Sequence, residues 1–298
     1  MYELIQVSEH DFYIDCPSRM GIVKTGENEV VMIDSGNDAS AAKKALRAIK
    51  ENGWTLSAVY NTHSHADHIG GNRYLEDNTG CRIYACRAEC DFIRHTGLEP
   101  QFLYGGFPAE ELLNKFFMAK PSNAIEITAE NIPAGWEIIP LPGHTNDQVG
   151  FLTPDRTAYI GDAVSSEETL SKYAISYVFD IETYLITMEK LRELDAACLV
   201  PSHAAHQKDI NRLCDVNGRV VREVGESILS MLKDPCTHDE LMKKVFDEYQ
   251  ITMSIPQYCL IGTTIKSYLL WMRKNGKTRC FIEDNRILWQ AEKKEADQ

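Results

Sequence analysis

The sequence predicts an α/β fold in which helices cover β-sheets, followed by a smaller helical domain at the C-terminal end. Over about the first two hundred of 298 residues, short β-branched runs alternate with helical stretches, a pattern typical of sheets with helices on their faces. The net charge of the chain also changes at about residue 206. Residues 1–206 hold 16 Lys and Arg against 30 Asp and Glu, whereas residues 207–298 hold 15 against 14, so that −14 and +1 give the net −13. We therefore predict two domains, 1–210 and 211–298.

The composition excludes several classes of protein. Hydrophobic residues make up 44% and charged residues 25%, as in ordinary globular proteins. No run approaches the roughly 18 apolar residues of a membrane span, and the N-terminal residues do not resemble a signal peptide. The nine Cys are scattered without a C-x-x-C pair, which predicts reduced thiols. We expect a cytoplasmic protein with no membrane partner, and the negative charge disfavours general attraction to nucleic acid.

The first elements are predicted as a hairpin, a helix and two strands. The runs Gly21–Lys24 and Glu29–Asp34 flank the turn 25–28. Asp38 can cap a helix of about Ala39–Asn52, which Gly53 ends. Strands are expected at 56–60 and 81–85.

Residues 86–120 form an aromatic-rich insertion, for which two interpretations stay open. It is either a helical insertion that packs its own aromatic side chains, or part of a substrate pocket. Beyond it, the sequence predicts strands near Trp136–Leu141, Gln148–Thr153 and Thr157–Ile160, a helix over about Ile181–Leu194, and a buried strand at Ala197–Val200.

The C-terminal part is predicted to contain three helices and a terminal hairpin. The helices are expected at about 220–233, 237–249 and 254–274, with Thr237 and Glu240 forming a capping box. Two β runs follow at 279–282 and 286–289. Three helices followed by a β-hairpin are the arrangement of a winged helix, which we predict for residues 211–298.

The residues that carry chemistry lie directly after the strand at 56–60. The motif H-S-H-A-D-H supplies three imidazoles and a carboxylate within six residues, a combination that suits zinc, iron or manganese. Three more apolar runs end close to a ligand-type residue, where open sheets commonly place functional groups. The sequence therefore predicts a metal site built from His63, His65, Asp67, His68, His144, Asp162 and His203.

The order H-x-H-x-D-H, P-G-H-T, G-D and a last His after an apolar strand resembles the metallo-β-lactamase superfamily over about residues 10–206. This resemblance implies an αββα sandwich, two mixed sheets with helices outside and a metal site at one edge. Carried over by position, His63, His65 and His144 would hold a first ion, Asp67, His68 and His203 a second, and Asp162 would bridge them. Asp34 is expected to orient a ligand His by accepting its other N–H.

The resemblance also implies hydrolysis with two divalent ions, zinc in the first place, with iron or manganese as alternatives. Such ions, roughly 3.5–4 Å apart, lower the pKa of a bridging water and yield hydroxide near neutral pH. Asp162 would hold their spacing and Asp67 would orient the hydroxide, so both are predicted to be catalytic. His206 is a candidate acid, with a surface role as the alternative. Tyr173 and Tyr177 are candidates to line the pocket, with ordinary packing as the alternative.

Three functions follow, in decreasing order of support. Asp162 stands where zinc β-lactamases generally carry Cys, so the pattern is closer to glyoxalase II and related thioesterases, which favours a small thioester or ester as substrate. The alternative is a ribonuclease or phosphodiesterase, favoured by a basic face of Lys266, Arg273 and Lys277. A DNA-binding regulator with a metal or metabolite sensor domain is the third. The aromatic insertion could supply a homodimer surface.

Overall fold

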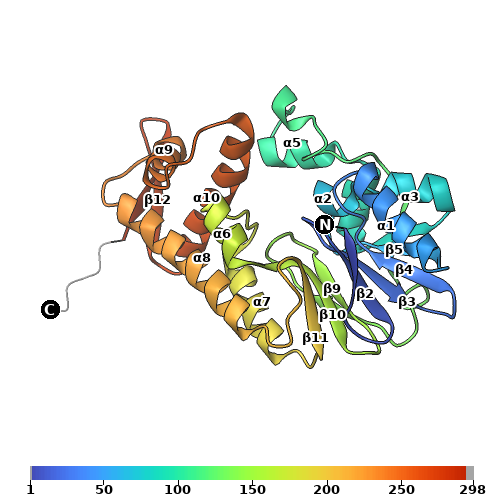
Figure 1. Ribbon diagram of the computed structural model, residues 1–298. Coiled ribbons are helices and arrows are strands. Elements are labelled where there is room, and N and C mark those ends of the chain that lie inside the picture. The colour runs from blue at the N-terminus through green and yellow to red at the C-terminus, as the bar shows by residue number, and fades with distance from the viewer. Residues whose placement is uncertain (1, 293–298) are drawn as a thin grey trace.

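The computed structural model describes residues 2–292, in which two β-sheets face one another and helices cover their outer faces (Figure 1). The larger sheet has seven strands in the order β1 to β7, antiparallel up to β4 and parallel from β4 onward. The strands are β1 (Glu3–Gln6), β2 (Asp11–Asp15), β3 (Met20–Lys24), β4 (Glu29–Ile33), β5 (Thr55–Tyr60), β6 (Arg82–Ala85) and β7 (Ala124–Glu126).

The smaller sheet has the order β11-β10-β9-β8. Its strands are β8 (Glu137–Pro140), β9 (Val149–Leu152), β10 (Thr157–Ser165) and β11 (Cys198–His203). We expected the third of these to end at Ile160, but β10 continues to Ser165. Its pairing with β11 shifts register on both sides of Gly161, where φ is +54°. Asp162 therefore lies inside an irregular strand and not beyond its end.

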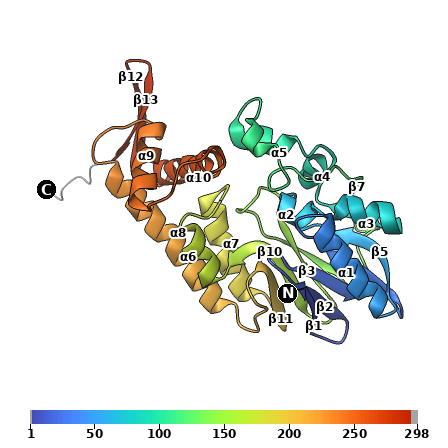
Figure 2. The same cartoon turned by 45° about the horizontal axis from the view of Figure 1, so that its top comes forward.

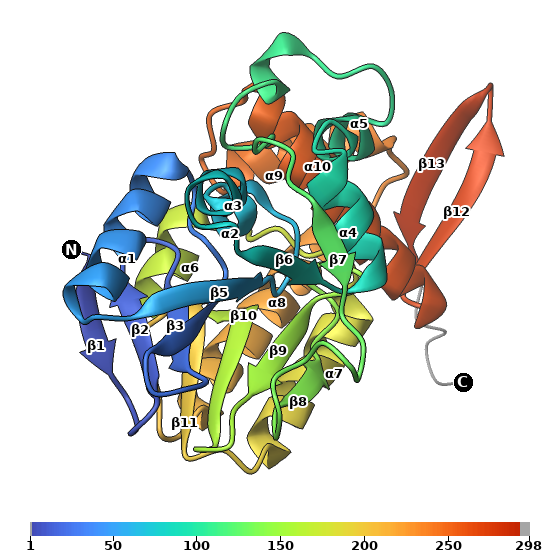
Figure 3. The ribbon, with the colours of Figure 1, turned by 90° about the vertical axis from the view of Figure 1, so that its right-hand side faces the viewer.

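Two layers of helices enclose the sheets (Figure 3). The helices α1 (Ala39–Glu51) and α3 (Asn72–Thr79) pack on the larger sheet, and α7 (Ile181–Glu193) and α8 (Asn211–Met231) pack on the smaller one. Between the sheets lies an apolar layer that includes Tyr60, Phe151 and Val200. The αββα sandwich implied by the sequence is thus confirmed.

The predicted first helix begins where its cap was expected. The Asp38 carboxylate accepts hydrogen bonds from the backbone N–H groups of Ser40 and Ala41 at 2.9 and 3.0 Å. It also accepts one from Lys115 of the insertion at 2.9 Å. Lys115 is the main cause that holds the pKa of Asp38 below its usual value, followed by the backbone N–H of Ala41.

We expect Asp38→Ala to lower the free energy of unfolding by about 1 kcal/mol, because two N–H groups of α1 lose their acceptor. Urea unfolding at pH 7 measures this. The loss should shrink as the pH falls below 3.8, since a carboxylate with a lowered pKa stabilises the fold only while it is ionised. Lys115→Ala, which removes an exposed ion pair and an exposed contact with the Phe116 ring, should lower the free energy of unfolding by less than Asp38→Ala does. An equal loss in the two variants would contradict the capping role.

The insertion is helical, but it is held only in part by its own aromatic side chains. It contains α4 (Arg87–Arg94), α5 (Leu98–Tyr104) and a short 3₁₀ turn (Glu110–Leu112). Phe92 meets Phe102 edge to face at 6.0 Å, yet Phe107 is 90% exposed. Leu103 and Leu112 instead bury themselves against Cys259 of the C-terminal part. Leu103 and Leu112, with Phe117 packed against them, therefore anchor the insertion. The first interpretation holds for its helices and for the pair of Phe92 and Phe102, but not for Phe107.

The C-terminal part contains the predicted helices and hairpin (Figure 2). After α6 (Glu167–Tyr173) and α7, its elements are α8, α9 (His238–Glu248), α10 (Ile255–Lys274), β12 (Thr278–Glu283) and β13 (Arg286–Ala291). The capping box of Thr237 and Glu240 is confirmed. Helix α8 begins well before residue 220, because Leu213 and Asn217 already face the sandwich. The assignment of residues 211–298 as a winged helix stays a prediction, as does the domain boundary at 210.

One apolar cluster continues from the smaller sheet through α7 and α8 into α9 and α10. The C-terminal helices therefore pack onto the sandwich through α7 and α8 and contact the insertion through α10, while the hairpin β12–β13 projects from them (Figure 2). Among the described residues, no helix combines the length and the hydropathy needed to cross a membrane.

Candidate metal centre

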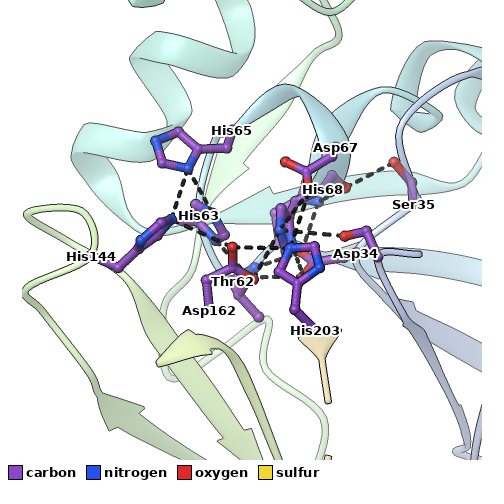
Figure 4. Close-up of polar contacts among 12 residues, drawn as sticks. Asp34, Ser35, Thr62, His63, His65, Asp67, His68, His144, Asp162 and His203 are labelled. Atoms are coloured by element: carbon purple, nitrogen blue, oxygen red, sulfur yellow. Dashed lines mark hydrogen bonds and ion pairs between the residues drawn. The ribbon is translucent and has the colours of Figure 1, made fainter. Parts of the chain in front are cut away.

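The seven predicted ligands come together where one edge of each sheet meets the other (Figure 4). The loop after β5 carries His63 and His65, and it leads into the short helix α2 (Ala66–Ile69) with Asp67 and His68. The smaller sheet supplies the other three ligands. They are His144 in the loop after β8, Asp162 in β10 and His203 at the last position of β11.

The first ligand group consists of His63, His65 and His144. His65 Nδ1 lies 3.1 Å from His63 Nε2 and 3.0 Å from His144 Nε2, so three ring nitrogens converge on one point. Burial lowers the pKa of all three imidazoles, in the case of His65 to about 3, with neighbouring imidazoles adding to the effect. At neutral pH these side chains are uncharged, which is the state in which imidazole binds a metal.

The second ligand group consists of Asp67, His68 and His203. Asp67 Oδ2 lies 3.3 Å from His203 Nε2 and 3.5 Å from His68 Nε2. Burial opposes charge on both imidazoles, but Asp162, supported by Asp67, outweighs it and raises the pKa of each above its usual range. This group is held by opposite charges, so uptake of a divalent cation there should displace protons.

Asp162 lies between the two groups. Its Oδ1 is 3.2 Å from His68 Nε2, and its Oδ2 is 3.2 Å from His203 Nε2 and 3.5 Å from His144 Nε2. Burial works against its charge, yet His203 and His68 hold its pKa well below the usual range. Within residues 2–292, the buried Oδ1 has no partner with hydrogen-bond geometry, although His68 Nε2 lies close to it. A buried carboxylate oxygen without a well-aligned donor, surrounded by imidazoles, fits a metal ligand.

The outward ring nitrogen of every ligand His except His65 has a close hydrogen-bonding partner. Such partners fix the tautomer and the ring orientation, and they leave Nε2 free to bind a metal. The pairs are His68 Nδ1 with Asp34 Oδ2 at 2.8 Å, His63 Nδ1 with Thr62 Oγ1 at 3.0 Å, His144 Nδ1 with the Tyr177 carbonyl at 3.2 Å and His203 Nδ1 with the Pro17 carbonyl at 2.8 Å.

Asp34 does more than accept the N–H of His68. It is 2% exposed, and its φ of 59° lies in the left-handed region that Asp tolerates better than most residues. Its carboxylate also accepts hydrogen bonds from Thr62 N and Thr62 Oγ1, each at 2.8 Å. Since Thr62 Oγ1 is in turn the partner of His63, Asp34 reaches both ligand groups. The sequence did not single out Thr62, although it directly precedes the motif.

Two glycines allow the ligand loops to pack closely. Gly143 has φ +127°, and a Cβ at that position would lie 2.4 Å from the Cα of Tyr184 in α7. A Cβ on Gly71 would lie 2.3 Å from the carbonyl oxygen of Ser35. The close contact at Gly71 is thus with the loop that follows Asp34.

Of the other predicted site residues, Tyr177 contacts two of the ligand rings, whereas Tyr173 and His206 contact other residues. Tyr177 meets His65 and His144 edge to face, with ring centroids 5.5 and 5.8 Å apart. Tyr173 is half-exposed, and its ring contacts Lys172. His206 is exposed and pairs through Nδ1 with the Tyr13 hydroxyl at 3.1 Å. The acid role of His206 and the pocket role of Tyr173 stay predictions.

The predicted basic face is only partly helical. Lys266 and Arg273 are exposed on α10, but the helix ends at Lys274, before Lys277. Gly276 takes up φ +65° and turns the chain toward β12. Lys277 instead lies over the Trp271 ring at 5.6 Å.

Two buried acids near the first ligand group were missed. Glu89 of α4 shares a helix face with Cys90 and Ile93, a spacing that should have indicated burial. Glu99 of α5 lies near His65, and burial, followed by Glu89, raises the pKa of its carboxyl to about 8.

With this geometry established, comparison with known families places the chain. The sequence profile of the Metallo-beta-lactamase superfamily matches residues 13–203. The chain belongs to the metallo-beta-lactamase superfamily. This match covers the strands from β3 to β11 and every residue of both ligand groups.

Curated relatives within the superfamily are distant. A hydroxyacylglutathione hydrolase from Hyphomonas neptunium is 29% identical over 140 residues, which is 47% of this chain and 44% of the relative. Hydroxyacylglutathione hydrolase GloC from Haemophilus influenzae is 24% identical over 139 residues, 46% of this chain and 62% of the relative. The chain spans about half the length of the curated relatives it matches.

Solved superfamily structures share the fold over nearly the whole chain. A metallo-beta-lactamase family protein from Thermus thermophilus has a TM-score of 0.70 at 18% identity, with 97% of each chain covered. A beta-lactamase domain protein from Burkholderia ambifaria has a TM-score of 0.71 at 15% identity, covering 97% of this chain and 94% of its own. Both of these solved structures therefore share the superfamily sandwich and the extra C-terminal helical region.

Proposed function

We propose that this superfamily member is a cytoplasmic binuclear metal-dependent hydrolase that acts on a small thioester or ester. The observation that carries the proposal is the pair of ligand groups on either side of Asp162. Two bound divalent ions would supply Lewis acidity and lower the pKa of a bound water. Zinc suits these nitrogen and oxygen ligands, and iron and manganese are the alternatives.

The side chains of this chain have distinct tasks in such a reaction. Asp162 touches both ligand groups and would keep two cations at a fixed spacing. Asp67 belongs to the second group alone, and its side chain is 37% exposed, so it can also accept a hydrogen bond from an attacking water and orient it. Tyr177 packs against His65 and His144 and forms a wall of the site.

Charge and relatives support a small thioester over a polyanion. Residues 1–206 carry −14, which would repel a nucleic acid. The distant relatives named above are hydroxyacylglutathione hydrolases, whose name describes action on a glutathione derivative. Because the chain spans about half of their length, the substrate is part of the proposal.

The second candidate is a metal-dependent ribonuclease or phosphodiesterase. It is favoured by the exposed Lys266 and Arg273 on α10 and by Lys277 beside Trp271, a basic and aromatic combination suited to nucleic acid. The predicted winged helix of residues 211–298 would serve this candidate function as a nucleic-acid-binding domain. A homodimer formed through the exposed aromatic residues of the insertion is compatible with either function.

A substrate panel separates the two candidates. The zinc-loaded protein is tested on acyl-thioesters of glutathione and of coenzyme A, on simple esters and on single-stranded RNA. We expect thioester hydrolysis with intact RNA. RNA cleavage that weakens when Lys266, Arg273 and Lys277 are neutralised would instead establish the second candidate. Binding of duplex DNA with steep salt dependence and no turnover would favour a regulator.

Removal of metal should abolish hydrolysis and destabilise the fold. Dialysis against a strong chelator should reduce the rate by more than about a hundredfold and lower the melting temperature. The melting temperature should rise again as zinc is added back, because an ion that binds only the folded state stabilises it by mass action. Magnesium, which prefers oxygen ligands, is the matched control and should restore neither property. Full activity in the chelated protein would contradict the proposal.

A further inference from the structure

The insertion brings two acidic side chains beside the first ligand group. Glu89 lies on α4 and Glu99 on α5, both within residues 86–120. Glu89 is 4% exposed, and the side chain of Glu99 is 13% exposed. Burying a carboxyl group is unfavourable unless the protein provides a partner for it. The partners of these two acids are therefore informative.

Glu89 connects the two chain segments that supply the first ligand group. Its Oε1 accepts a hydrogen bond from Thr145 Oγ1 at 2.9 Å, and Thr145 directly follows the ligand His144. Ser64, which separates the ligands His63 and His65, lies close enough to this carboxyl to offset part of the rise that burial causes in its pKa. One side chain of the insertion thus joins a loop of the larger sheet to a loop of the smaller sheet.

Glu99 lies beside His65, the one ligand imidazole that presents Nδ1 and not Nε2 to the other ligands. His65 directs Nδ1 toward the other two nitrogens of its group, so its Nε2 must carry the proton when Nδ1 binds a metal. Glu99 Oε1 lies 3.7 Å from this Nε2. The other four ligand imidazoles have a partner for their outward nitrogen at 2.8 to 3.2 Å. The contact of Glu99 with His65 is longer than a hydrogen bond, so a small shift of the Glu99 side chain toward His65 would complete the pattern for the fifth imidazole.

We propose that the insertion is part of the first metal site, in which Glu89 and Glu99 act as positioning residues. Glu89 holds the two ligand loops together, and Glu99 orients His65 by accepting its Nε2–H. The inference rests on the two-metal centre of the proposed function, but not on its substrate. It predicts that changes in the insertion alter the affinity of the first site for metal and leave the second site unchanged.

Competition of the metal-free protein with a chromophoric chelator for zinc tests this inference, because such a titration resolves two binding steps and needs no turnover. Glu99→Ala should weaken one step by about 10- to 100-fold, the usual cost of losing a partner of a metal ligand. Glu99→Gln, which keeps an oxygen acceptor, should restore much of that affinity. Glu89→Gln should weaken the same step. Glu110→Gln and Glu111→Gln, exposed in the same insertion, are the matched controls.

The outcomes separate this inference from the proposed function. Unfolding of each metal-free variant in urea is measured in parallel, since a purely structural role would lower stability and weaken both binding steps together. That result, or unchanged binding in all Glu89 and Glu99 variants, would overturn the inference alone. Failure of the unaltered protein to bind two ions would overturn the proposed function and the inference with it.

Discussion

Replacing Asp162 with alanine is expected to lower the rate of hydrolysis by about a thousandfold or more. This carboxylate is the only one of the seven ligands that contacts His68, His203 and His144, and so both ligand groups. Its loss would leave those imidazoles without the charge that balances a cation. Metal centres contribute several kcal/mol of transition-state stabilisation, and each ~1.4 kcal/mol is a factor of ten in rate.

The measurement is kcat/KM on the best thioester of the panel, together with the metal content of the purified variant. We expect metal content to fall from two ions per chain to one or fewer. Asp77→Ala, an exposed aspartate on α3, is the control and should change neither value. An Asp162→Ala protein that keeps both ions and its rate would show that Asp162 does not join the two groups.

Asp34→Ala is expected to damage both the fold and the metal site. It would leave Thr62 N, Thr62 Oγ1 and the Nδ1–H of His68 without their acceptor in the protein interior. Each buried group left unpaired costs about 1–3 kcal/mol. We therefore expect the free energy of unfolding to fall by about 3 kcal/mol or more, and many chains to fail to fold at 37 °C.

Asp34→Asn tests the same role without unfolding the protein. Asn tolerates the left-handed φ and keeps one acceptor oxygen, but it brings an N–H₂ group toward donors. Metal affinity should fall by about 10- to 100-fold, as for other partners of metal ligands. Asp38→Ala is the matched control four residues away, since it weakens the cap of α1 and should leave metal affinity unchanged. Equal metal binding by Asp34→Asn and the unaltered protein would contradict the role of Asp34.

The strands and the candidate ligands were predictable from local patterns in the sequence, whereas the αββα arrangement and the grouping of the seven ligands into two sites were implied by the family resemblance. Apolar runs mark the strands, and ligand-type residues close to their ends mark one edge of the sheets. Asp34 was predictable from its position in the family pattern. The capping residues Asp38 and Thr237 act within four residues of the backbone groups they bind, so short sequence windows contain their partners.

The remaining features depend on contacts between distant segments. Glu89 meets Thr145, 56 residues away, and this pairing depends on how the insertion docks onto the sandwich. The extension of β10 through Gly161 depends on pairing with β11, which a run of apolar residues ending at Ile160 does not show. The early part of α8 contacts β10 through the polar Asn217, so an apolar pattern in the sequence does not reveal it. Lys277 leaves the basic face because Gly276 ends the helical path.

The metal content of the purified protein after reconstitution tests the central claim most directly. The protein is loaded with zinc, freed of excess metal by gel filtration, and measured by elemental analysis against protein concentration. Two ligand groups that share Asp162 predict two ions per chain, with thioester hydrolysis rising as the second ion binds. Fewer than one ion per chain would contradict a binuclear hydrolase.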